Sequence, residues 1–192
     1  MNEEMFAIRG LDPLVWTRHV RGLYRSGVCL VMPAQKELGI LKEMGQGTSE
    51  HYVEAQEAFA AYCRTSGLLF GLAIENAYKT RKIIEGQITV ENGAMIGLKT
   101  GHDIAEMVRE HGIVLDAEEV LAVDSITCVV QDLGKYPVAK SAKVQGKFNN
   151  TFYGPEYVRR LSARIIVQML KEDPYVKIFA KERLADVMDS QS

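Results

Sequence analysis

Apolar residues recur every three or four positions from Ser49 to about Glu85, which is the spacing of an amphipathic α-helix. The repeating positions are Tyr52, Ala55, Phe59, Tyr62, Leu69, Ala73, Ala77 and Ile84. This is the longest periodic stretch in the chain. Gly67 and Gly71 lie four apart within it. They either break the helix near Ser66 or form a flat face against a neighbouring helix, and we favour close packing.

Helix-start signals place a helix before this stretch and several after it. Asp12-Pro13 is typical of an N-cap followed by proline at the first helical position, which predicts a helix over 13–26. Its outer side carries Arg18, Arg21 and Arg25, a stripe that is either solvated or contacts a phosphate or a partner.

Four further start signals follow. Thr100 and Asp103 fit a capping box that opens a short helix ending at Gly112, and Asp116 with Glu119 opens a helix that ends at Leu133 and Gly134. Two Pro-containing starts, Gly154-Pro155 and Asp173-Pro174, open the last two helices.

Two segments are predicted to be connections. Residues 33–49 mix Pro, Gly and polar residues, so we expect at most one short helical turn there. Residues 86–99 contain three glycines and an Asn-Gly pair, which predicts a loop or a small hairpin. Six helices and no convincing sheet predict an all-α, up-and-down helical bundle that forms a single domain over 1–192.

Composition fits a globular protein, with 47% apolar and 25% charged residues. No apolar run approaches the roughly 20 residues that span a bilayer, and the acidic start MNEEMF does not resemble a secretory signal, so we expect a cytoplasmic protein. Cys29, Cys63 and Cys128 are predicted to be buried, reduced thiols. A net charge of −2 argues against a surface wholly committed to nucleic acid.

Three short motifs follow one another along the chain. They are Ala73-Ile74-Glu75 with Lys79 on the long helix, Gly101-His102-Asp103 before a short helix, and Lys135-Tyr136-Pro137 after the next helix. In this order they resemble the HEPN superfamily, the higher eukaryotes and prokaryotes nucleotide-binding domains. The resemblance implies a HEPN-like core over about 50–140, with N-terminal and C-terminal helical extensions, the latter at 155–188. It also implies a homodimer that binds or acts on nucleotides or RNA, in a prokaryotic defence setting such as a toxin–antitoxin pair or in regulation.

Ribonucleases of that superfamily carry an arginine followed, four to six residues later, by a histidine. None of the four histidines here has an arginine at that distance. We therefore expect a non-catalytic or cryptic HEPN-like domain that binds a nucleotide, RNA or a protein partner.

His102 and Asp103 are the best local candidates for catalysis, because an imidazole beside a carboxylate can act as a base, a metal ligand or a phosphate contact. The alternative is structural, with Asp103 belonging to the capping box. Glu75 and Lys79 are either a surface pair one helical turn apart or part of a polar network opposite His102.

The segment from Leu133 to Pro155 contains no acidic residue and alternates lysines with aromatic and amide side chains. Lys135, Tyr136, Lys140 and Lys143 are its candidate ligand-binding residues, since such a segment can hold a phosphate or stack a base. The alternative is a solvated connection.

Two other functions stay open. One is a phosphodiester hydrolase, with either an unconventional HEPN site or a metal site like that of HD-type phosphohydrolases, built from His51, His102, Asp103 and Asp124. The other is a module that only binds protein. The departure of residues 98–101 from the HD pattern makes the metal site the weakest of these hypotheses, so we predict no metal and no cofactor.

Overall fold

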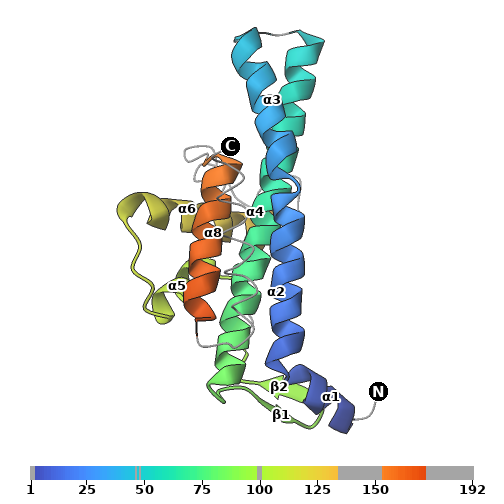
Figure 1. Cartoon of the computed structure of the whole chain (residues 1–192), viewed down its shortest axis with the longest axis vertical. Coiled ribbons are helices and arrows are strands. Elements are labelled where there is room, and N and C mark those ends of the chain that lie inside the picture. Colours follow the sequence, from blue (N-terminus) through green and yellow to red (C-terminus); the bar gives the residue numbers. More distant parts are fainter. Residues whose placement is uncertain (1–2, 46, 48, 99–100, 134–152, 172–192) are drawn as a thin grey trace.

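The long helix predicted from the sequence is the central element of the structure. A computed structural model (Figure 1) describes residues 3–45, 47, 49–98, 101–133 and 153–171. Within them α4 (Glu50–Ile84) is one unbroken helix, and helices on several sides pack against it. The fold is the all-α helical bundle that the periodicity predicted.

α4 begins where the periodic stretch predicts and then enters two different environments. Ser49 is the N-cap, and its side chain accepts a hydrogen bond from the amide of Tyr52 at 3.3 Å. The C-terminal half is buried on almost every side, which requires neighbours all around it. The buried residues there are Ser66, Gly67, Phe70, Gly71, Ala73, Ile74, Glu75, Asn76, Ala77, Tyr78, Thr80 and Ile83.

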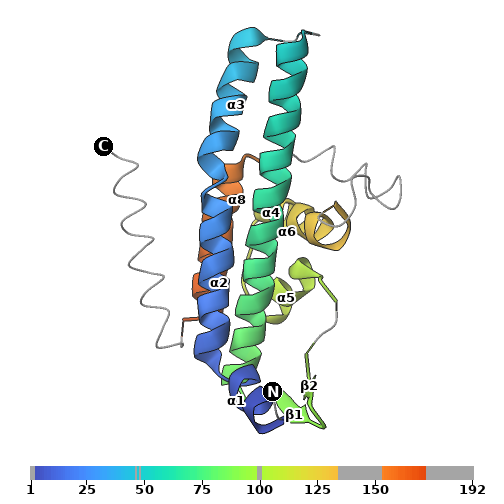
Figure 2. The same cartoon turned by 90° about the vertical axis from the view of Figure 1, so that its right-hand side faces the viewer.

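α2 (Pro13–Val28) runs antiparallel to α4, as Figures 1 and 2 show. Its predicted start is confirmed, because Asp12 caps the helix by accepting from the amide of Leu14 at 2.9 Å. The ring of Tyr24 packs against Phe70 of α4 at 5.5 Å between centroids. A short preceding helix, α1 (Glu3–Gly10), was not predicted.

The connection predicted for residues 33–49 is wrong over most of its length, because α3 (Val31–Met44) occupies it. Pro33 lies in the first turn, where backbone N–H groups have no partner inside the helix, so the ring breaks no hydrogen bond. Gly39 only weakens the helix. Packing against α4, which local sequence patterns do not reveal, outweighs that penalty.

The sequence predicted either a loop or a small hairpin at residues 86–99, and the structure has the hairpin. β1 (Thr89–Glu91) pairs antiparallel with β2 (Ala94–Ile96). Asn92 and Gly93 form the turn, and both have positive φ, 50° and 73°. That conformation is the two-residue type I′ turn which an Asn-Gly pair favours.

α5 (Ile104–Glu110) and α6 (Ala117–Cys128) lie on the side of α4 that faces away from α2, as both views show. The predicted capping box of Asp116 and Glu119 is confirmed at the start of α6. After Cys128 the helix changes to a π-helical turn, η1 (Val129–Leu133), so the predicted helix is helical over all of its described residues; its predicted end at Gly134 lies outside them.

α8 (Pro155–Met169) begins at the predicted Gly154-Pro155 and packs on α4. Arg159, near its start, interacts with Tyr24 of α2. The pKa of His111 is lowered by burial and by nearby cations. These include Arg81 in the last turn of α4 and Lys171 just past the end of α8, so the two helix ends lie close together. α8 therefore runs in the same direction as α4.

The expectation for the three cysteines is only partly right. All three are free thiols, but Cys29 is exposed and the other two are half-buried. Burial raises the pKa of Cys63 to about 12, so this thiol stays protonated. Among the described residues, none of the helices combines the length and apolar character needed to cross a membrane. The helix predicted to start at Asp173-Pro174, which forms the end of the 155–188 extension, lies outside the described residues.

The two glycines of α4 form a packing face, as we favoured. A Cβ at Gly71 would clash with Val130 and would lie 2.8 Å from Ile126, whereas a Cβ at Gly67 would meet Val129 at an ordinary 3.8 Å. Gly71 is therefore what allows α6 and η1 to approach α4 closely.

This difference gives a matched pair of substitutions. Gly71→Ala should lower the free energy of unfolding by about 1–3 kcal/mol through overpacking. Gly67→Ala should leave it unchanged or raise it by about 1 kcal/mol, because alanine favours the helix. Urea denaturation of both variants measures the difference, and equal stabilities would contradict the close approach at Gly71.

Candidate functional site

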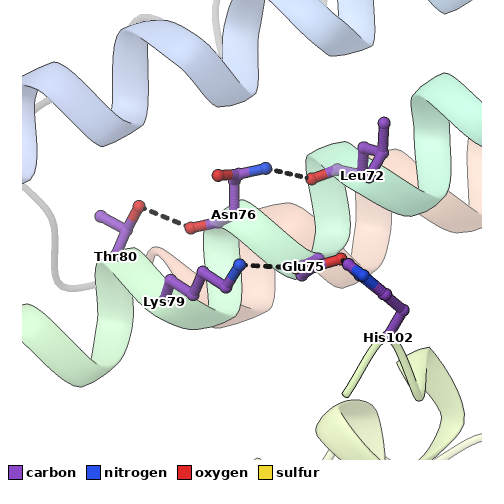
Figure 3. Close-up of polar contacts among 6 residues, drawn as sticks. All are labelled: Leu72, Glu75, Asn76, Lys79, Thr80 and His102. Carbon is purple, nitrogen blue, oxygen red and sulfur yellow. Dashed lines mark hydrogen bonds and ion pairs between the residues drawn. The ribbon is translucent and has the colours of Figure 1, made fainter. Parts of the chain in front are cut away.

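A buried carboxylate lies between a lysine and a histidine where α4 meets the start of α5. Glu75 is buried on α4, and its Oε1 accepts from Nζ of Lys79, one turn further along, at 2.5 Å. Its Oε2 lies 2.8 Å from Nδ1 of His102. Figure 3 shows the two partners reaching Glu75 from opposite directions. The polar network that the sequence offered as one alternative for Glu75 and Lys79 is confirmed.

Glu75 is charged at neutral pH despite its burial. Burial alone raises its pKa, but the hydrogen bonds from His102 and Lys79 outweigh this and leave the pKa below its ordinary value. An ionised carboxylate only accepts hydrogen bonds, so Nδ1 of His102 carries the proton and donates. Whenever the imidazole is neutral, this bond leaves its lone pair on Nε2, and 36% of the side chain is exposed.

The cap of α5 positions His102, although not by the predicted residues. Asp103 is itself the N-cap and accepts from the amide of Glu106 at 2.8 Å, so the prediction of Thr100 as the cap with Asp103 reaching back is wrong. Aspartate caps a helix as well as threonine does, and the later start leaves His102 outside the helix. Asp103 therefore has a structural role, and among the described residues its carboxylate forms no hydrogen bond or ion pair with His102. Thr100 lies outside the described residues.

Thr127 also positions this site, and the sequence analysis did not identify it. Its hydroxyl donates to the carbonyl of Val123 at 2.9 Å and accepts from the amide of Ala105 at 3.1 Å. The second bond satisfies an amide in the first turn of α5 and ties that turn to α6. No local sequence pattern distinguishes Thr127 from the other polar residues of this helix, such as Asp124 and Ser125.

Neighbouring polar groups of α4 do not extend the network. Asn76 donates through Nδ2 to the carbonyl of Leu72 at 2.7 Å, and Thr80 donates to the carbonyl of Asn76 at 2.8 Å (Figure 3). Both bonds remain within one helix. The network of Glu75, Lys79 and His102 is thus the contact that joins α4 to the segment before α5.

The arrangement required by an HD-type metal site is not formed. His51 lies in the first turn of α4, exposed and paired with Glu54, roughly 36 Å along the helix from Glu75 at about 1.5 Å per residue. Asp124 is exposed on α6. In the described part of the chain, no group of three or more His, Cys, Asp or Glu side chains could hold a metal ion.

The other candidate ligand-binding residues, Lys135, Tyr136, Lys140 and Lys143, lie outside the described residues. The chain matches no protein-family model, no curated protein and no solved structure. The resemblance to HEPN proteins therefore depends on the sequence motifs alone.

Removing the charge of Glu75 should make the protein less stable and change how its stability depends on pH. Glu75→Gln leaves Lys79 and His102 without their carboxylate, and we expect a loss of about 1–3 kcal/mol at pH 7. Because the folded pKa lies below the ordinary 4.5, the contribution of Glu75 is present above that pH and disappears as pH falls through the folded pKa.

Urea denaturation of the wild type and Glu75→Gln at pH 7 and in acid measures this. The stability difference between the two proteins should shrink as the pH is lowered. A difference that is the same at both pH values would contradict the ionised, paired state of Glu75.

Proposed function

We propose that this chain is a non-catalytic or cryptic HEPN-like domain that binds RNA or a nucleotide, as a homodimer in the cytoplasm. The observation that supports binding over catalysis is that Glu75 engages both Lys79 and His102. A catalytic site for phosphodiesters needs cations directed at the phosphate. Here one carboxylate engages both the ammonium of Lys79 and the imidazole of His102 and joins two elements through them.

The motifs support the superfamily, and the geometry is compatible with it. The Glu75–Lys79 pair and His102, which belong to two of the motifs quoted above, meet in space although they come from separate segments. The third motif supplies the basic segment, with Lys135, Tyr136, Lys140 and Lys143 as the ligand-binding candidates. Prokaryotic defence or regulation is the setting that the resemblance suggests.

RNA binding should depend on the basic segment. Lys140→Glu with Lys143→Glu should weaken binding of a labelled single-stranded RNA, because two phosphate contacts are lost and two repulsions are added. The slope of log affinity against log salt should flatten by roughly 1.4, since each phosphate contact contributes about 0.7. Fluorescence anisotropy over a salt series measures both quantities.

A matched control places the same change of net charge elsewhere. Arg9→Glu with Lys171→Glu reverses two exposed cations, one on α1 and one after α8. This variant should bind RNA with nearly the wild-type salt slope. Equal weakening in both variants would mean that net charge, rather than the segment at 135–143, controls binding.

One observation favours a hydrolase as the second candidate. A carboxylate that holds Nδ1 and leaves Nε2 of a part-exposed imidazole free is how a general base is oriented in many enzymes. Under that alternative, the wild type cleaves RNA and His102→Ala does not, while circular dichroism shows that the variant still folds.

Under our proposal, neither protein cleaves RNA above a buffer control. Gel analysis of the two proteins with a labelled RNA decides between these outcomes. Cleavage that depends on His102 would overturn the non-catalytic proposal.

A further inference from the structure

The far end of the α3–α4 pair extends beyond the rest of the bundle. Figures 1 and 2 both show this part projecting past α5, α6 and α8. We call residues 35–44 of α3 and 50–62 of α4 the distal hairpin. Ala55 is its only buried residue.

The distal hairpin carries more apolar surface than two helices can cover. Six of its large apolar side chains are only partly buried, and Met44 and Val53 are 39% and 43% exposed. The partly buried ones are Leu38, Ile40, Leu41, Tyr52, Phe59 and Tyr62. Two antiparallel helices bury one seam, whereas two such pairs together enclose a core. The surface is therefore half of a four-helix arrangement.

Its charges indicate which partner completes that arrangement. Lys36 and Lys42 are exposed on α3, and Glu50 and Glu57 are exposed on α4. Within the described part of the chain, these four side chains form no ion pair or hydrogen bond. Lys36 lies about as many residues before the connection between α3 and α4 as Glu57 lies after it, so the two residues are at the same level along the hairpin. Lys42 is level with the start of α4.

We propose that two copies of this chain associate through their distal hairpins, with α3 of each copy against α4 of the other. A twofold axis along the hairpin brings Lys36 level with Glu57 of the second copy, and does so twice because the contact is repeated by symmetry. Lys42 then lies level with Glu50 of the second copy. The distal hairpins are then the interface of the homodimer in the proposed function. This interface rests on the proposed function only for the expectation that a homodimer forms.

Charge reversal and its compensation test this surface in the full chain. Lys36→Glu and Glu57→Lys should each raise the dimer dissociation constant at least about tenfold, because each places like charges opposite one another twice. The double variant should return to within about threefold of the wild type. Val53→Glu should also weaken the dimer by placing a charge in the apolar face. Multi-angle light scattering and sedimentation velocity over a concentration series measure these values.

Arg9→Glu is the control, because it reverses an exposed cation on α1, at the end of the molecule opposite the distal hairpin, and should leave the dimer intact. Circular dichroism verifies folding of every variant. A monomeric wild type, or a dimer that tolerates both single reversals, would overturn the inference. So would a double variant no tighter than the single ones. RNA binding by a protein that stays monomeric would refute this surface and leave the binding proposal standing.

Discussion

The C-terminal half of α4 has neighbours on all sides, and this constraint determines most of the structure. Every side chain from Ser66 to Thr80 must either pack against another helix or satisfy its polar atoms within the protein. Glycine at position 71 lets α6 and η1 approach, and Phe70 meets Tyr24 of α2. Where α4 leaves this environment, towards its N-terminus, α3 is its only long neighbour within the described ranges.

Glu75 follows from the same constraint. A carboxylate buried alone would be protonated or would destabilise the fold, whereas two charge-assisted hydrogen bonds keep it ionised. One of its partners comes from its own helix and one from 27 positions away, so the charge is stable only when α4 and the segment before α5 are assembled. This makes the network a condition for correct packing and at the same time fixes the direction of the His102 ring. The hydrogen bond to Glu75 that stabilises this packing is thus also the one that orients His102 for any chemistry.

The local signals were read correctly where a few neighbouring residues decide the outcome. Asp12 and Asp116 each cap the helix that follows, and Asn92-Gly93 makes the expected turn. Errors arose where distant contacts decide. The proline and glycine of residues 33–49 suggested a loop, but packing on α4 keeps α3 helical. The sequence brought Glu75, Lys79 and His102 forward as candidates. It did not show that Asp103 alone would cap α5, or that Thr127 would hold the first turn of that helix.

The different surroundings of the two ends of α4 also bear on its local opening. A helix with buried side chains on every face opens only when the bundle opens, whereas a helix with one neighbour frays at much lower free energy. Backbone amides near Phe70 are therefore expected to exchange with solvent only through global unfolding. Those near Val53 exchange through local fluctuations of the α3–α4 pair. One continuous helix thus contains both the most and the least protected amides of the bundle, and whatever covers its exposed end extends that protection along it.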